Sequence, residues 1–271
     1  MNQDSSSAQA GSRVNGTAKP SSASDAPPRT LEQVAVELRR KVVDLLQLQT
    51  NDELLQNLQK QVRISLEVIE ESFKRYRPDE LSLSYNGGKD CLVLLVLILA
   101  CLPSSTSTFS RFPEHLQSIF IIPYDSFPEV EEFVATSARE YFLELSRYVL
   151  PMRPALDAYL DEKPNIKAIW IGTRRVDPNG GHLTHFDYTD KDWPQFMRIH
   201  PVIDWHYAEI WAFIRYLDLE YCPLYDRGFT SLGGVGDTQP NPALAVENDP
   251  SRFRPAYELK EDNEERLGRD R

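Results

Sequence analysis

The chain has 271 residues, of which 41% are hydrophobic and 26% charged, and this ordinary globular composition excludes a wholly disordered chain. Thirty basic residues against 41 acidic ones give a net charge of −11, which disfavours sequence-independent binding to nucleic acid or anionic lipid. Three cysteines without a CxxC spacing cannot form a disulfide framework or a four-thiolate zinc site, so we expect a reducing compartment.

Residues 1–29 hold seven serines, three prolines and no aromatic residue. They cannot bury enough apolar surface to offset the entropy of ordering, so we predict a disordered tail. The tail lacks the apolar segment of a secretory signal, while its basic residues among serines leave a mitochondrial transit peptide as the alternative. We expect a cytoplasmic location.

From residue 30 onward we expect a single catalytic domain, which begins with two helices. Thr30 and Gln33 match a capping box, and apolar residues then recur at helical spacing as far as Leu46. A second helix is predicted from about Asn51 to Tyr76. We expect residues 30–76 to form a helical cover for the sheet, although a partner surface is the alternative.

Residues 80–217 alternate between strand and helix patterns. The run 81–85 predicts a strand, and the apolar run from Cys91 to Leu102 predicts a buried helix that is too short to span a membrane. Further strands are predicted at 118–122, 147–150 and 167–171, with helices at 127–145 and 154–162. This alternation is typical of an α/β fold with a mostly parallel sheet flanked by helices.

The second half of the chain is less regular. Residues 172–200 show no sustained period but contain four aromatic side chains, so they predict a long functional loop rather than disorder. Residues 202–214 predict a strand end and a helix. Residues 218–271 predict an irregular C-terminal segment that ends in an arginine-bearing tail.

A glycine turn, Tyr85-Asn86-Gly87-Gly88-Lys89-Asp90, joins the first strand to the buried helix. Such a turn is an anion site in a parallel sheet, because unpaired N–H groups and the helix dipole converge there. Lys89 would add positive charge, and Asp90 would orient donors or hold Mg²⁺. The pattern is neither Walker A nor a dinucleotide fingerprint, and a plain turn with a solvated Lys–Asp pair is the alternative.

Residues 84–91 resemble the SGGKDS pyrophosphate loop of the ATP-pyrophosphatase and PAPS-reductase superfamily, with Asn86 for the first Ser and Cys91 for the last. Together with segments 171–178, 198–205 and 223–233, this loop resembles the fungal-type FAD synthetases, which are FMN adenylyltransferases. The resemblance covers roughly residues 60–271. It implies that the phosphate of FMN attacks the α-phosphorus of ATP, assisted by Mg²⁺, and that FAD and pyrophosphate are formed.

The residues and the resemblance together suggest two substrate sites. A flavin ring needs an acidic acceptor beside an aromatic residue, and Asp190 and Trp193 supply this pair. Asp177 would orient Arg174 or a metal-bound water, or would serve only in an Asp-Pro turn. The expected ATP site comprises Tyr85, Asn86, Gly87, Gly88, Lys89, Asp125, Ile171 and Gly172; the flavin site comprises Arg174, Asp177, Asp190, Trp193, Arg266 and Arg269; the catalytic set comprises Lys89, Asp90, Asp177, Arg266 and Arg269.

Two of these expectations have plain structural alternatives. Asp125 would contact adenosine or simply cap a helix. Arg266 and Arg269 resemble the paired-arginine motif of the family and, three residues apart on one helical face, would reach one phosphate cluster. A solvated run of charges is the alternative for the arginines.

Three other functions compete with adenylyl transfer. A PAPS-type sulfonucleotide reductase needs a nucleophilic cysteine near the C-terminus, whereas the last cysteine here is Cys222. A tRNA-modifying pyrophosphatase would need a basic surface, which the net charge of −11 disfavours. A non-catalytic ATP- or flavin-binding module remains open. We expect a monomer with ATP and FMN as its partners, and with neither nucleic acid nor membrane.

Overall fold

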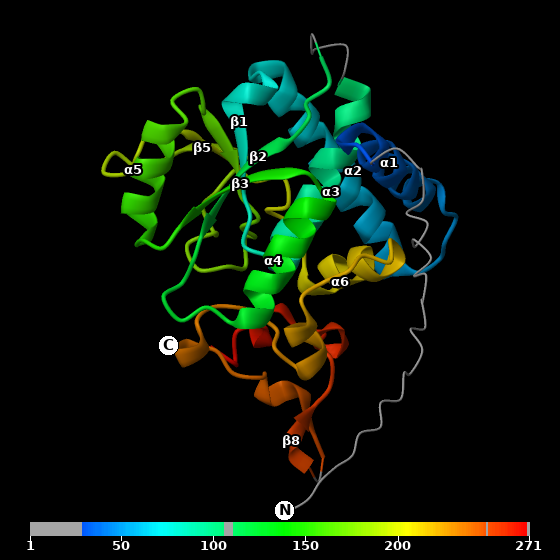
Figure 1. Cartoon of the computed structure of the whole chain (residues 1–271). Helices are drawn as coiled ribbons and strands as arrows, with labels where there is room; N and C mark the ends of the chain where they lie inside the picture. Colours follow the sequence, from blue (N-terminus) through cyan, green and yellow to red (C-terminus); the bar gives the residue numbers. More distant parts are fainter. Residues whose placement is uncertain (1–28, 106–110, 248, 270–271) are drawn as a thin grey trace, which may run out of the picture.

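The computed structural model describes residues 29–105, 111–247 and 249–269 (Figure 1). Residues 1–28 of the predicted tail lie outside this range. Helix α1 (Leu31–Gln47) begins at the predicted capping box: Gln33 N donates to Thr30 Oγ1 at 3.3 Å, and Thr30 N donates to Gln33 Oε1 at 3.0 Å. Helix α2 (Glu53–Arg75) begins after Asp52, whose carboxylate accepts from Leu54 N at 2.9 Å.

A six-stranded sheet with the order β3-β2-β1-β4-β6-β5 forms the centre of the fold. Five strands run parallel, and only β5, at one edge, runs antiparallel. The predicted mostly parallel α/β fold is therefore confirmed. The strands are β1 (Leu81–Ser84), β2 (Leu116–Ile121), β3 (Leu143–Tyr148), β4 (Ala168–Trp170), β5 (Phe186–Tyr188) and β6 (Met197–Ile199).

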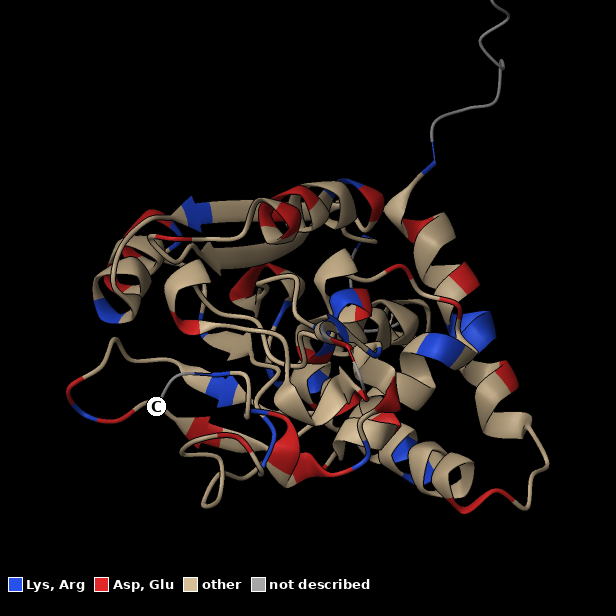
Figure 2. Ribbon diagram, turned by 90° about the horizontal axis from the view of Figure 1, so that it is seen from below, with Lys and Arg blue, Asp and Glu red and all other residues tan. Residues whose placement is uncertain are grey.

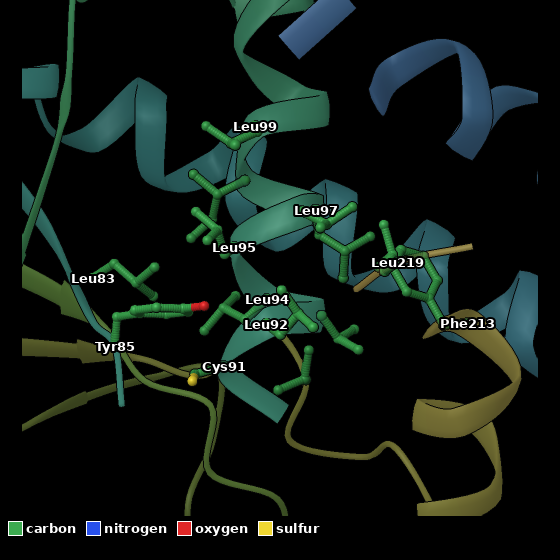
Figure 3. Close-up of a cluster of buried hydrophobic side chains, with 14 of the residues drawn as sticks. Leu83, Tyr85, Cys91, Leu92, Leu94, Leu95, Leu97, Leu99, Phe213 and Leu219 are labelled. Carbon is green, nitrogen blue, oxygen red and sulfur yellow. The ribbon is translucent and has the colours of Figure 1, made fainter. Parts of the chain in front are cut away.

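Helix α3 (Lys89–Ser105) is the apolar centre of the molecule, and each residue from Cys91 to Leu102 is buried, as predicted. Its leucines contact β1 on one side and α6 (Tyr207–Tyr216) on another (Figure 3). Helices α1 and α2 lie on the outer side of α3, and α4 (Pro128–Glu140) also joins this core. Helix α5 (Met152–Glu162) covers the other face of the sheet (Figure 1).

Four predictions about secondary structure were wrong. The helix predicted to end at residue 145 ends at Glu140, because Phe142 has a φ of +56° that no α-helix accommodates. The following strand therefore begins at Leu143 rather than at residue 147. Residues 172–200 contain the β5–β6 hairpin, whose three-residue strands are too short to show an alternating pattern. The strand predicted to end near Val202 ends at Ile199 (β6), since residues 201–204 form turns.

The C-terminal segment is largely irregular, as predicted. It contains a small antiparallel pair, β7 (Ala245–Val246) and β8 (Asp249–Phe253). Short 3-10 turns are η1 (Pro78–Glu80), η3 (Pro223–Arg227), η4 (Val235–Asp237), η5 (Pro242–Leu244), η6 (Ala256–Glu258) and η7 (Asp262–Glu264). Within the described ranges, no helix has both the length and the hydropathy needed to cross a bilayer.

Candidate active site

The glycine turn after β1 is held in shape by its own residues. Gly87 has a φ of +72°, and a Cβ there would lie 2.7 Å from Val134 Cγ2 of α4, so only glycine fits. The Asn86 side-chain oxygen accepts from Gly88 N and from Cys91 Sγ, both at 2.9 Å. The turn is therefore built before any ligand arrives.

The side chain of Tyr85 faces away from the turn. It is fully buried, and its hydroxyl donates to Ser137 Oγ of α4 at 2.8 Å (Figure 3). The prediction that Tyr85 contacts ATP therefore applies only to its backbone. The structure adds Tyr225 to the turn instead, since its hydroxyl accepts from Lys89 N at 2.9 Å. Tyr225 lies in the segment 223–233, but the sequence did not indicate this role.

The end of β4 lies directly against the same turn. A Cβ on Gly172 would lie 3.0 Å from Cys91 N, in the first turn of α3. The register of β1 with β4 explains this contact, because Leu83 is opposite Trp170 and both strands end at one edge of the sheet. The structure thus brings together the two chain segments that were predicted to bind ATP.

A cluster of buried charges lies at this edge. Figure 2 shows that acidic (red) and basic (blue) residues are also spread over the rest of the chain. Lys89 Nζ lies 3.0 Å from Asp90 Oδ2 and forms a second, shorter ion pair with Glu265 Oε1. Arg174 Nη2 pairs with the other carboxylate oxygen of Glu265. Arg174 Nε lies 2.9 Å from Asp90 Oδ1, but the two atoms are not aligned for a hydrogen bond. Arg174 Nη2 also lies 3.7 Å from Asp177 Oδ1.

The charged forms of Lys89, Arg174 and Asp90 are stabilised within this cluster, whereas that of Asp177 is disfavoured. Burial lowers the pKa of Lys89, but the carboxylates of Asp90 and Glu265 outweigh burial and leave the Lys89 pKa raised. Burial likewise raises the pKa of Asp90, but Arg174 and Lys89 outweigh it and leave the Asp90 pKa lowered. Burial raises the pKa of Asp177. Both cations therefore stay charged, although Nε and Nη1 of Arg174 have no hydrogen-bond partner among the described residues.

These contacts change the roles expected for three residues. Lys89 is 2% exposed and Arg174 is fully buried, so in this structure their charges face carboxylates rather than an open phosphate or flavin site. Asp90 does not fit the role of an Mg²⁺ ligand, since its two oxygens face Lys89 and Arg174. No group of three or more acidic, histidine or cysteine side chains suited to a metal occurs in the described part of the chain.

Asp125, predicted to contact adenosine, holds a second glycine turn. Its carboxylate accepts from Gly236 N at 2.7 Å, and its backbone oxygen accepts from Val235 N at 2.8 Å. A Cβ on Gly234 would lie 2.1 Å from Asp125 Oδ1, so the turn at 233–236 packs closely on this side chain. Asp125 is exposed, and it joins the end of β2 to the C-terminal segment.

The tail arginines lie near this edge but not on a helix. Residues 265–268 form turns, so the prediction of a shared helical face was wrong. Arg269 Nη2 donates to Asp237 Oδ2 at 3.0 Å, while Arg266 is exposed. Glu265, directly before Arg266, is the main site residue that the sequence reasoning missed.

Asp190 and Trp193 lie at the other end of the sheet. Met197 starts β6 beside Ala168, the first residue of β4, so the hairpin at 189–196 lies at the amino ends of these strands. Trp193 N donates to Asp190 O at 2.9 Å, and the ring is 37% exposed. The structure keeps this pair together but separates it from the glycine turn by the length of β4, about 10 Å.

His200, in the turn after β6, provides a pH-dependent prediction. It is 1% exposed, its ring nitrogens have no hydrogen-bond partner among the described residues, and burial lowers its pKa to about 4 from 6.5. Between these pH values the unfolded state binds more protons, so stability should fall as pH decreases from 6.5 to 4. A difference of this size is worth about 3 kcal/mol.

Urea unfolding at pH 7 and at pH 4 tests this prediction. We expect His200→Gln to lose less stability between the two pH values than the wild type does. His182→Gln, at an exposed position of the preceding loop, should retain the wild-type difference. An equal loss in the wild type and in His200→Gln would contradict the prediction.

Comparison with known proteins agrees with this architecture. The model of the phosphoadenosine phosphosulfate reductase domain matches residues 80–155 and 146–240, and so defines the class. A probable FAD synthase of Schizosaccharomyces pombe is 45% identical over 218 residues, which cover 80% of this chain and 82% of that protein. Within the class, the chain belongs to the FAD synthase family.

Two further relatives extend the comparison. A probable FAD synthase of Caenorhabditis elegans is 36% identical over 205 residues, 74% of this chain but only 39% of the longer relative. The crystal structure of Candida glabrata FMN adenylyltransferase, in complex with FMN and the ATP analogue AMPCPP, matches with a TM-score of 0.83 at 30% identity. The match covers 89% of this chain and 98% of that one.

Proposed function

We propose that the protein is an FMN adenylyltransferase, which transfers AMP from ATP to the phosphate of FMN and releases pyrophosphate as FAD forms. The observation that carries the proposal is the meeting of three distant segments at one edge of the sheet. The glycine turn at 86–90, the strand exit at 171–177 and the tail at 262–269 meet in one buried charge cluster. Membership of the FAD synthase family supports the same reaction.

Adenylyl transfer requires that the reacting groups be positioned and that negative charge be stabilised. We assign the leaving pyrophosphate to the backbone of residues 86–88 and the N-terminus of α3, where N–H groups and the helix dipole favour anions. Adenosine would lie against the Ile171–Gly172 backbone. Arg266 and Arg269 would bind phosphate oxygens, which guanidinium groups engage with paired hydrogen bonds.

Mg²⁺ is proposed to arrive with ATP. The ion prefers one or two carboxylates together with substrate phosphates, and it retains several waters. Asp90 does not fit as a ligand, for the reason given above. Asp177, whose side chain is 27% exposed, is the carboxylate that we assign to the ion.

We place the flavin along the open edge of the sheet. FMN is elongated, with its phosphate at one end and its ring at the other. A phosphate at the carboxyl end of β4 and a ring beside Asp190 and Trp193 would follow the β5–β6 hairpin along the edge. In this arrangement the Asp190 carboxylate accepts the ring N–H, and Trp193 packs against the ring.

This flavin site yields a binding prediction. Asp190→Ala should weaken both FMN and FAD binding about tenfold or more, since a hydrogen bond to a charged group is lost, while ATP affinity stays unchanged. Quenching of flavin fluorescence measures the first two constants, and an ATP titration measures the third. Asp192→Ala, at an exposed position of the same hairpin, is the matched control and should bind FMN normally. Wild-type FMN binding by Asp190→Ala would remove this residue from the site.

The reaction itself is tested by incubating the full chain with FMN, ATP and Mg²⁺ while both FAD and pyrophosphate are followed. Formation of both in equal amounts supports the proposal. Tight binding of FMN and ATP without either product would favour a non-catalytic binding module. Omitting Mg²⁺ tests the assignment of the ion.

The competing sulfonucleotide reductase lacks a suitable nucleophile. Cys222 is buried, and burial raises its pKa to about 11, so the reactive thiolate is disfavoured. The other two cysteines are also buried free thiols with raised pKa values. Three buried free thiols suit a reducing compartment, so we propose a cytoplasmic location. We also propose that the protein acts as a monomer.

A further inference from the structure

The C-terminal segment inserts a carboxylate, Glu265, into the centre of the site. Glu265 is 5% exposed; one carboxylate oxygen pairs with Lys89 Nζ and the other with Arg174 Nη2. Its backbone oxygen accepts from Thr230 Oγ1 at 2.6 Å. Both ends of the residue are thus fixed, and Lys89 lies 176 positions away in the sequence.

The two tail arginines follow Glu265 within one short turn. Arg269 N donates to Arg266 O at 3.0 Å, and Gln239 N donates to Gly268 O at 2.8 Å. The guanidinium of Arg269 also lies over Gly233, where a Cβ would come within 2.3 Å of it. Gly268 and Arg269 are therefore tied to the loop at 233–239, and Arg266 is joined to them through its backbone. Glu265 ties the same turn to the first turn of α3.

We propose that Glu265 is a positioning residue for adenylyl transfer. Its two ion pairs hold the arginine-bearing turn against the glycine turn, so that Arg266 and Arg269 are aligned before phosphate arrives. The inference rests on the proposed function, because it assumes that these arginines act on the transferred phosphates. Such transfer depends mainly on positioning, so a small displacement of the arginines should have a large effect on turnover.

The buried geometry explains why a carboxylate is needed. Without Glu265, the two buried cations would face Asp90 and two more distant carboxylates, Asp177 at 3.7 Å and Asp262 at 4.0 Å from Arg174. Removing one partner of a buried ion pair leaves the other charge uncompensated. A neutral side chain at position 265 should therefore release the turn at 265–269 from α3, while its bonds to the loop at 233–239 remain.

Glu265→Gln tests the proposal because glutamine has nearly the same shape but no charge. We expect kcat for FAD formation to fall about 10²-fold, while FMN affinity, measured by fluorescence quenching, changes little. Arg269→Ala should lower kcat in the wild type but add little in the Glu265→Gln background, because both changes act through the same turn. A purely structural role would change the fraction of folded enzyme but would not produce this coupling.

Trypsin provides a readout that does not depend on activity. Cleavage after Arg266 removes the end of the chain, which intact mass spectrometry detects. In Glu265→Gln this cleavage should be faster than in the wild type. Glu80→Gln is the matched control: Glu80 is 6% exposed and pairs with Lys167, but it lies just before β1, at the opposite end of that strand. That variant should retain the wild-type rate of cleavage after Arg266 and the wild-type kcat.

If Glu265→Gln does not fold, a second variant tests the proposal. Thr230→Val removes the hydroxyl that donates to Glu265 O and accepts from Asn241 Nδ2 at 2.8 Å, and it should lower kcat severalfold in the same direction. Wild-type kcat in either folded variant, or full additivity of Glu265→Gln with Arg269→Ala, would overturn the proposal. If the wild type forms no FAD, the proposed function fails, and the trypsin comparison still decides whether Glu265 anchors the tail.

Discussion

Replacing Arg174 by methionine is expected to lower the free energy of unfolding by about 3–5 kcal/mol. Methionine retains much of the side-chain length but leaves the carboxylates of Asp90 and Glu265 to share Lys89 alone. For a chain of this size the midpoint of thermal unfolding should decrease by roughly 10 °C. Differential scanning calorimetry measures the change.

The neighbouring arginine is a natural control. Arg175 is also ion-paired, to Asp204 at 2.6 Å, but its side chain is 43% exposed. Exposed ion pairs contribute little, so Arg175→Met should melt close to the wild type. Equal midpoints for Arg174→Met and Arg175→Met would show that the buried cluster does not stabilise the fold.

Lys89→Met is expected to affect both stability and turnover. Its buried ammonium pairs with Asp90 and Glu265, so its loss should destabilise the fold by about 3–5 kcal/mol. Turnover of the protein that remains folded should fall by about 10²-fold, because Lys89 holds Glu265 and with it the arginine-bearing turn in position. Calorimetry measures the first effect, and pyrophosphate release, measured well below the unfolding midpoint, measures the second.

The matched control for Lys89 is Lys167→Met. Lys167 also pairs with a buried carboxylate, Glu80, but the lysine side chain is 61% exposed and lies at the far end of β1. We expect normal turnover from that variant. Wild-type turnover in folded Lys89→Met would exclude Lys89 from the reaction, whereas a normal melting temperature with slow turnover would assign it to chemistry alone.

The glycine turn shows how much of a site is present in local sequence. Gly87 requires a positive φ, Asn86 braces the turn with its own side chain, and the apolar run after Lys89 can only be buried. Each of these requirements is local, so the turn, the helix that follows it and the α/β class were all predictable. Short elements were not, because three residues of β5 or β6 carry no measurable period.

Tertiary structure decided what the charged residues contact. Lys89 and Glu265 are far apart along the chain, and nothing in the local sequence of either indicates that they will pair. The local sequence likewise does not indicate that Arg174 is fully buried, because β4 and the tail together bury it. Nor does it indicate that Asp190 is separated from the glycine turn.

The sequence by itself determined the fold class, the pyrophosphate-type loop and the resemblance to one enzyme family, because backbone conformation and hydrophobic burial depend on neighbouring residues. Only the folded chain decided that Lys89 and Arg174 are neutralised by a tail carboxylate rather than left open to ligand. The physical reason is that a buried charge is stable only beside an opposite charge, and that partner comes from whichever distant segment the fold places there.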